Sequence, residues 1–202
     1  MAIVNFAKLT YFTTFHAMTE KEKMLNGMLY DANSDPQLIA ERLECKEKCR
    51  DYNDLRPRDT ERRKHMLHAI FGNIDGELLV EQPFYCDYGY NISVGRNFYA
   101  NFNMVILDEA PVRFGDNVFV APNCSFYTAG HPVDAVERNK GIEYARPISI
   151  GNDVWIGGNV TVLPGVTIGD NCVIGAGSVV VNDIPAGSVA VGNPCRIIRK
   201  IE

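Results

Sequence analysis

The sequence lacks the features that mark membrane proteins and nucleic-acid-binding proteins. Its 202 residues contain no unbroken apolar run of the length, about 18 residues, that a membrane-spanning helix needs. Basic residues are outnumbered, with 20 Lys and Arg against 25 Asp and Glu. The resulting net charge of -5 argues against a general nucleic-acid binder, although a total charge says nothing about local basic patches. The apolar opening lacks a basic segment and a clear cleavage site, so we expect no secretory signal.

Patterns that bind metal ions are also missing. None of the six cysteines forms a C-x-x-C pair, and no spacing between them resembles a zinc cluster. Only one of the four histidines, His131, follows residue 68. We therefore predict no metal cofactor, and we expect reduced, mostly structural thiols as in a cytoplasmic protein. Cys45 and Cys49 are four residues apart and would share one face of a helix.

Helix signals dominate the first third of the chain. Asp35 followed by Pro36 is a good helix start, because Asp caps the first N–H groups and Pro fits a position whose N–H would be unpaired. A second helix is expected over residues 60–71, and Gly72 is suited to the position just after its end.

After residue 72 the spacing of the apolar residues changes to six. The series runs without error through Ile150, Ile156, Val162, Ile168, Ile174 and Val180. A helix repeats every 3.6 residues and a plain strand every two, whereas six is the hexapeptide repeat of a parallel β-helix. Strands of a β-sandwich would be separated by turns of varied length and would not keep one phase. Three units close one coil, so Ile150 should stack on Ile168.

The sequence thus predicts a mainly β protein, a left-handed parallel β-helix with an N-terminal helical segment and one protruding loop. Residues 1–17 would be a poorly ordered extension, upstream of a natural start at Met18 or left over from cloning. The other regions expected are the helical segment 18–72, the β-helix 73–190 with its inserted loop 127–147, and a C-terminal tail 191–202.

The inserted loop 127–147 interrupts the repeat and carries His131 near its base. Long loops in compact folds are usually functional or disordered. Gly130 and Pro132 restrict the backbone on either side of the histidine. An imidazole held there suits a general base that takes a proton from a substrate hydroxyl near neutral pH. An incidental surface histidine is the alternative.

Five stretches carry a resemblance to a known family: Y-T-A-G-H-P, N-F-Y-A-N-F-N, C-D-Y-G-Y-N-I, P-I-S-I-G-N-D-V-W-I-G and V-G-N-P-C-R-I-I-R-K-I. Together the chain from Met18 to Glu202 resembles the maltose/galactoside O-acetyltransferases. The resemblance implies transfer of acetyl from acetyl-CoA to a hydroxyl of a sugar of the maltose, glucose or galactoside type. It implies His131 as the general base, direct attack in a ternary complex, and homotrimers with each site between two β-helices. The exposed loop would then reach a neighbouring chain.

The same resemblance implies further site residues. On the acceptor side these are Asp31, Asp87, Asn101 and Glu109. Asn101 stands where acceptor and thioester meet, so it also counts on the coenzyme side, together with Trp155, Gly158, Ala176, Val181, Asn182, Arg196 and Arg199. Arginine suits phosphate geometry. Asp31, Asp87 and Glu109 could equally be solvated carboxylates. Gly158 and the Val181-Asn182 pair depart from relatives that carry serine and Thr-Lys there.

Three other functions compete with this interpretation. Zinc carbonic anhydrases of the γ type share the prism but need three histidines, and only His131 lies in the repeat region. A xenobiotic (antibiotic) O-acetyltransferase would use the same chemistry on another acceptor, although the helical segment 18–72 weighs against it. A non-enzymatic scaffold would make His131 incidental. Release of free thiol from acetyl-CoA with a panel of acceptors separates these functions.

Overall fold

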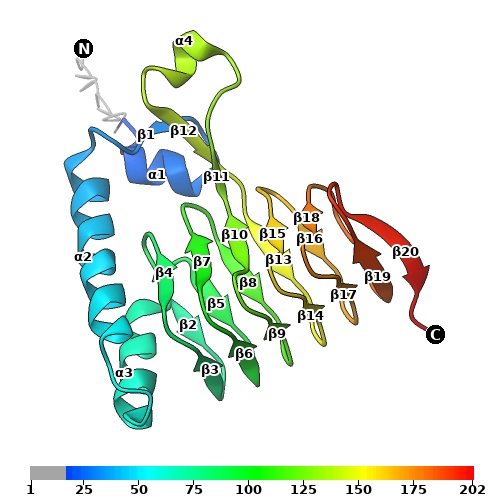
Figure 1. Cartoon of the computed structure of the whole chain (residues 1–202). Helices are drawn as coiled ribbons and strands as arrows, with labels where there is room; N and C mark the ends of the chain where they lie inside the picture. The colour runs from blue at the N-terminus through cyan, green and yellow to red at the C-terminus, as the bar shows by residue number, and fades with distance from the viewer. Residues whose placement is uncertain (1–16) are drawn as a thin grey trace, which may run out of the picture.

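The computed structural model describes residues 17–202. The expectation of a poorly ordered extension over 1–17 therefore lies, but for Ala17, outside the described residues. Within residues 17–202, no helix combines the length and the apolar character needed to cross a membrane. Figure 1 shows a helical segment standing at one end of a long stack of short strands.

The helical segment contains α1 (Glu20–Leu25), α2 (Pro36–Asn53) and α3 (Thr60–Ile70), with the short strand β1 (Tyr30–Asp31) between the first two. The predicted start of α2 is confirmed, because the Asp35 side chain accepts a bond from the Leu38 N–H at 2.8 Å. The expected role of Gly72 as the glycine that ends this helix is wrong. Phe71 already has an extended backbone, and a Cβ on Gly72 would overlap the Tyr90 carbonyl, so glycine serves a close backbone approach there.

The predicted parallel β-helix is confirmed. Its first sheet contains, in chain order, β2 (Asn73–Ile74), β5 (Ile92–Val94), β8 (Val112–Phe114), β13 (Ile148–Ile150) and β16 (Thr167–Ile168). Its second contains β3 (Leu78–Val80), β6 (Phe98–Ala100), β9 (Phe119–Val120), β14 (Trp155–Ile156), β17 (Val173–Ile174), β19 (Ser188–Val191) and β20 (Arg196–Lys200). Its third contains β4 (Phe84–Cys86), β7 (Met104–Leu107), β10 (Ser125–Tyr127), β15 (Thr161–Val162) and β18 (Val179–Val180).

The residues that repeat every six positions fill the interior of this column. Ile150 pairs with Ile168, Ile156 with Ile174 and Val162 with Val180, as the 18-residue coil predicts. All six are buried. Each buried Val or Ile contributes roughly 1.5–3 kcal/mol through the apolar area removed from water. In the earlier coils the rings of Phe98, Phe114 and Phe126 take over this role, with centroids 5.0 and 4.9 Å apart.

Asparagine side chains hold the corners of successive coils in line. Asn97, Asn117 and Asp153 have positive φ angles of 56°, 55° and 57°, which Asn and Asp tolerate better than most residues. The Asn97 amide donates to Asn117 Oδ1 at 3.0 Å, and the Asn117 amide donates to Asp153 Oδ1 at 2.8 Å. The ladder therefore satisfies the turns while it fixes the register between coils.

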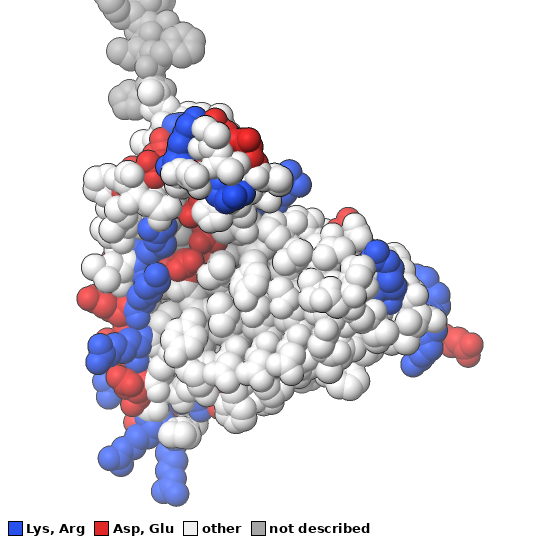
Figure 2. Space-filling model, turned by 45° about the horizontal axis from the view of Figure 1, so that its top comes forward, with Lys and Arg blue, Asp and Glu red and all other residues white. Residues whose placement is uncertain are grey.

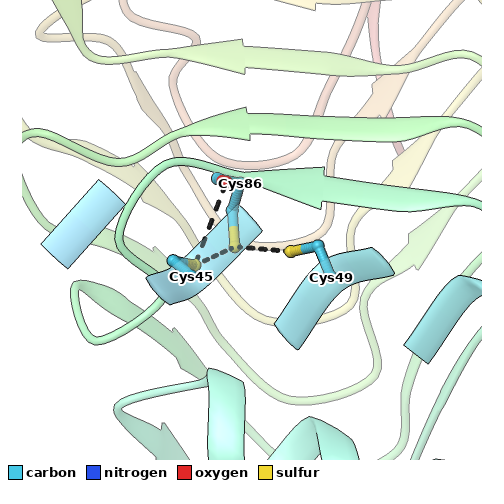
Figure 3. Close-up of side chains that lie close together, drawn as sticks. All are labelled: Cys45, Cys49 and Cys86. Atoms are coloured by element: carbon cyan, nitrogen blue, oxygen red, sulfur yellow. Dashed lines mark hydrogen bonds between the residues drawn. The ribbon is translucent and has the colours of Figure 1, made fainter. Parts of the chain in front are cut away.

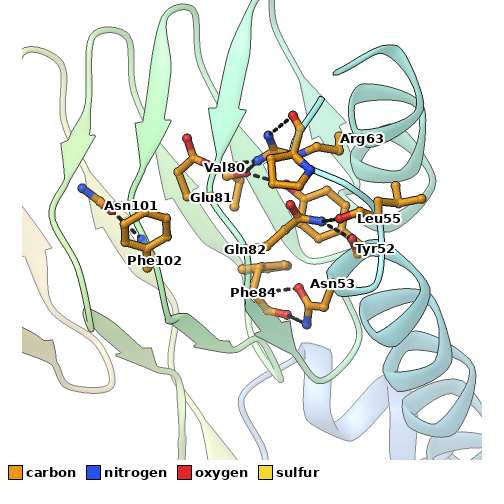
Figure 4. A network of polar contacts seen from close by, with 11 residues as sticks. Tyr52, Asn53, Leu55, Arg63, Val80, Glu81, Gln82, Phe84, Asn101 and Phe102 are labelled. Atoms are coloured by element: carbon orange, nitrogen blue, oxygen red, sulfur yellow. Dashed lines mark hydrogen bonds and ion pairs between the residues drawn. The ribbon is translucent and has the colours of Figure 1, made fainter. Parts of the chain in front are cut away.

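The helical segment covers the first coil through polar contacts as well as apolar ones (Figure 4). Buried Arg63 on α3 donates to the Val80 carbonyl at 2.7 Å and to Glu81 Oε2 at 2.9 Å. Asn53 at the end of α2 donates to the Phe84 carbonyl and accepts from the Phe84 N–H, at 2.9 and 2.8 Å. The amide of Asn53 thus stands in for a neighbouring strand on the free edge of β4.

The inserted loop is more ordered than the sequence predicts. It forms a hairpin of β11 (Ala129–Gly130) and β12 (Ile142–Ala145), with the short helix α4 (Ala135–Arg138) at its tip. β12 pairs antiparallel with β11 and also with β1 of the helical segment, through Tyr30 and Glu143. The loop therefore pairs with the helical segment of its own chain. The expected tail, 191–202, likewise includes a strand, because β20 folds back antiparallel on β19.

The interior stack leads to a stability prediction. We expect Ile168→Ala to lower the free energy of unfolding by about 2–5 kcal/mol, because the cavity opens inside a closed column. Thr167→Ala, at the neighbouring exposed position of β16, should cost less than about 1 kcal/mol. Urea unfolding at one fixed protein concentration measures both. Equal losses in the two variants would contradict the assignment of the inward face.

Candidate active site

A hollow of about 440 Å³ lies where the strands of the third sheet end, against α2 and the β11–β12 hairpin. Three predicted residues meet in it: Asp87 after β4, Glu109 after β7, and His131 after β11. Figure 2 shows acidic side chains gathered in this recess between the helical segment and the β-helix. Its lining is completed by Asn33, Arg42, Lys46, Leu107, Tyr127, Ala129, Gly130 and Glu143.

His131 is exposed, and one hydrogen bond sets the orientation of its ring. Its Nδ1 lies 3.1 Å from the Ile142 carbonyl oxygen of the opposite hairpin strand. A carbonyl can only accept, so Nδ1 carries the proton and Nε2 keeps a free lone pair. Gly130 permits this arrangement, because a Cβ there would lie 2.6 Å from the Tyr144 hydroxyl. The hairpin thus presents an imidazole in the tautomer that can accept a proton.

Beneath the hollow, Asp108 is fully buried. Its Oδ1 accepts the backbone N–H groups of Asp87 and Tyr88 at 3.1 and 2.8 Å. Its Oδ2 has no hydrogen-bond partner among residues 17–202. Burial raises the pKa of Asp108 to about 6, and the backbone bonds only partly oppose that shift. Asp108 therefore fixes the backbone from which Asp87 projects.

Glu109 and Asp87 are neighbouring carboxyl groups in different surroundings. Glu109 is buried, and burial together with the Asp87 carboxylate raises its pKa well above its usual range. Asp87 is half-buried and pairs with Lys46 Nζ at 3.6 Å. A neutral acid beside a carboxylate offers one hydrogen-bond donor and several acceptors at one spot. That combination suits a ligand rich in hydroxyl groups.

Three other predicted residues, Asn101, Gly158 and Ala176, lie on the opposite side of the third sheet, where its strands begin. They occupy the corners before β7, β15 and β18, whereas the hollow lies where such strands end. β7 alone, with 4 residues, spans roughly 13 Å at about 3.3 Å per residue. Consecutive corners on that side are joined by backbone hydrogen bonds, such as Gly177 N–H to the Gly158 carbonyl at 2.8 Å. One chain therefore does not bring them to His131.

The remaining predicted residues are spread over the later coils and the helical segment. Trp155 is exposed on β14, and Arg196 and Arg199 are exposed on β20, whereas Val181 and Asn182 follow β18. Asp31 is outside the lining of the hollow. Its Oδ1 accepts the N–H groups of Asn33 and Ser34, both at 3.0 Å, so its carboxylate closes a turn.

Sequence reasoning missed Asn33, Arg42, Lys46, Tyr127 and Glu143 in the hollow. Arg42 and Lys46 are four residues apart on α2, a spacing that places both on one face of the helix. That spacing indicates that the two side chains lie together, but it does not indicate which face of α2 meets the β-helix. Glu143 accepts from the Tyr30 hydroxyl at 2.9 Å, a contact between residues 113 positions apart that no local pattern indicates.

Comparison with known proteins gives consistent matches. The maltose acetyltransferase hexapeptide capping motif matches residues 23–76, and the bacterial transferase hexapeptide (six repeats) matches residues 147–182. A putative acetyltransferase of Saccharomyces cerevisiae is 54% identical over 180 residues, 89% of this chain and 92% of its own length. The crystal structure of a maltose O-acetyltransferase from Clostridium difficile 630 is 55% identical with a TM-score of 0.90, covering 93% of this chain and 100% of that one.

A galactoside acetyltransferase in complex with coenzyme A is also similar. It is 45% identical, with a TM-score of 0.89, and 92% of each chain is covered. Both solved structures therefore match more than nine-tenths of this chain.

The buried carboxyl of Asp108 predicts a pH-dependent difference in stability. Its pKa rises from 3.8 to about 6 on folding, so the folded state binds the proton more tightly than the unfolded state. The contribution of Asp108 to stability should therefore fall as pH rises from 4 to 7.5. Asp108→Asn keeps the acceptor for Asp87 and Tyr88 but cannot ionise. We expect its free energy of unfolding relative to wild type to rise by roughly 2–3 kcal/mol across that interval.

Denaturant unfolding at pH 4, 6 and 7.5 measures this difference. Asp54→Asn, which alters an exposed carboxylate outside the hollow, is the matched control and should show no such trend. A difference between Asp108→Asn and wild type that stays constant with pH would refute the protonated state.

Proposed function

The chain belongs to the maltose and galactoside O-acetyltransferase family of hexapeptide-repeat proteins, and on this premise we propose that it transfers acetyl from acetyl-CoA to a hydroxyl of a sugar of the maltose, glucose or galactoside type. The observation that carries the proposal is the free Nε2 of His131 beside the Asp87–Glu109 pair in one hollow. A relative's complex with coenzyme A supports the donor.

The transfer needs a base because a sugar hydroxyl is a poor nucleophile while it holds its proton. His131 Nε2 takes that proton as the acceptor oxygen bonds to the thioester carbonyl carbon. The tetrahedral intermediate collapses by breaking the carbon–sulfur bond, and the imidazolium returns the proton to the leaving thiolate. General-base assistance of this kind is worth about 10²–10⁴ in rate. The Ile142 carbonyl contact stabilises the imidazolium that forms between the two proton transfers.

Direct transfer, without an acetyl-enzyme, is supported by the cysteines. All six are buried, so no thiol is presented at the surface of the hollow as a nucleophile. The proposal therefore requires acetyl-CoA and acceptor to be bound together. It places the acceptor in the hollow lined by Asp87 and Glu109, with the coenzyme arriving from outside it.

The coenzyme side is proposed to come from a second copy of the chain in a homotrimer. The strands of the third sheet begin near Asn101, Gly158 and Ala176 and end near His131. The two groups would therefore meet where the third sheets of two adjacent chains face each other. The outward residues of that sheet support such a contact, because none is charged: Tyr85, Val105, Leu107, Ser125, Tyr127, Thr161 and Val179. Arg196 and Arg199 would bind coenzyme phosphates.

Replacing the proposed base separates chemistry from binding. We expect His131→Ala to lower kcat by about a hundredfold or more while coenzyme A binding changes by less than about twofold. Release of free thiol measures turnover, and calorimetric titration with coenzyme A measures binding. His68→Ala, an exposed histidine on α3, is the control and should keep wild-type turnover. An unchanged rate in His131→Ala removes this histidine from the mechanism.

The two carboxyl groups should respond differently to amide substitution. Asp87→Asn replaces a charged acceptor and should raise KM for the sugar about tenfold or more. Glu109→Gln replaces a neutral acid by a neutral amide, which also donates and accepts, so its effect should stay below about threefold. KM for acetyl-CoA should be constant in both, and Glu47→Gln, on the exposed side of α2, controls for the substitution. The reverse order of effects would contradict the assigned protonation states.

A further inference from the structure

Three thiols that the sequence keeps apart converge beneath α2. Cys45 and Cys49 lie one turn apart on the face of α2 that packs on β4, and Cys86 ends β4. Cys86 Sγ lies 3.5 Å from Cys45 Sγ and 3.7 Å from Cys49 Sγ. All three sulfur atoms lie within 4.8 Å of one another, and all three side chains are buried. Figure 3 shows them pointing toward one common point.

The spacing of these sulfur atoms suits a single metal ion. A zinc–sulfur bond of about 2.3 Å places two thiolates of one tetrahedral ion about 3.8 Å apart, and those of a trigonal ion about 4.0 Å apart. The distances of 3.5 and 3.7 Å from Cys86 Sγ differ from these values by only a few tenths of an ångström, and the Cys45 and Cys49 sulfur atoms lie within 4.8 Å of each other. Without an ion, the same contacts are weak S–H···S hydrogen bonds.

A path to the site exists. A second hollow of about 420 Å³ opens to solvent beside α2 and is lined by both Cys49 and Cys86. It gives an ion a way in and gives a water molecule room to complete the coordination. Lys46 and Arg50, the residues that follow Cys45 and Cys49, line the same hollow. Three thiolates and a divalent ion carry a net charge of -1, which these two cations at the rim would offset.

We propose that Cys45, Cys49 and Cys86 form a site for a thiophilic divalent metal ion of the zinc class, with a water molecule as the fourth ligand. Binding takes the three cysteines as thiolates, and any proton that a thiol still carries leaves to solvent, so it needs neither oxidant nor reductant. The bound ion would tie α2 to β4 one residue before Asp87. The hollow beside the site adjoins the one that holds His131, since Lys46, Asp87 and Leu107 line both, but the test of the metal site does not depend on activity.

Cadmium is the probe, because its thiolate complexes absorb in the ultraviolet and carboxylate or imidazole complexes do not. The full-length protein, reduced and freed of metal with a chelator, is titrated with Cd²⁺. We expect the absorbance to saturate at one ion per chain. The variant with Cys45→Ala, Cys49→Ala and Cys86→Ala should lose at least about nine-tenths of the absorbance. Cys124→Ala and Cys172→Ala, at buried thiols inside the column, should keep it.

A second measurement covers the case in which the triple variant does not fold. Zn²⁺ should raise the thermal midpoint of the wild-type protein by several degrees, because an ion that binds only the folded state stabilises it by mass action. Each of the three single Cys→Ala variants, if folded by circular dichroism, should show less than half of that shift. The proposal is overturned if folded wild-type protein gives no thiolate band or gains no thermal stability.

Discussion

The structure depends on one constraint: every sixth residue must pack on its counterpart one coil away. Strands about 4.8 Å apart leave no space for a polar or missing side chain between Ile150 and Ile168 or between Ile156 and Ile174. Because each coil contacts only its neighbours, an insertion at one corner leaves the stack intact. The corners after β4 and β7 each hold two extra residues, and the longest insertion, between β10 and β13, carries His131. The repeat therefore supplies rigidity, and its insertions supply the residues of the hollow.

In a column of this kind the backbone N–H and C=O groups of the first coil have no neighbouring strand to pair with. The helical segment supplies hydrogen-bond partners for several of them. Asn53 pairs with both backbone groups of Phe84, and Arg63 satisfies the Val80 carbonyl. These contacts hold α2 in the place where Arg42 and Lys46 line the hollow that contains His131. The residues that cover the first coil thus also position one wall of that hollow.

Patterns within the sequence were enough to predict the β-helix, the register of its later coils and the start of α2 at Asp35, because period and capping are local properties. Contacts between the helical segment and the column were not predictable in this way. The pairing of β1 with β12, the burial of Asp108 and the meeting of Cys86 with Cys45 and Cys49 join residues far apart in the chain. Gly72 shows the limit on a small scale, since a helix-ending glycine and a glycine needed for close approach look alike in sequence.

The pairing of β1 with β12 has a consequence for how such enzymes diversify. The hairpin that bears His131 and the strand β1 of the helical segment form one small antiparallel sheet. On the proposed function, substitutions in residues 20–70 and in the hairpin that alter acceptor preference should be coupled through that sheet. A chimaera that exchanged only the hairpin or only the helical segment between family members would pair a β1 and a β12 from different proteins.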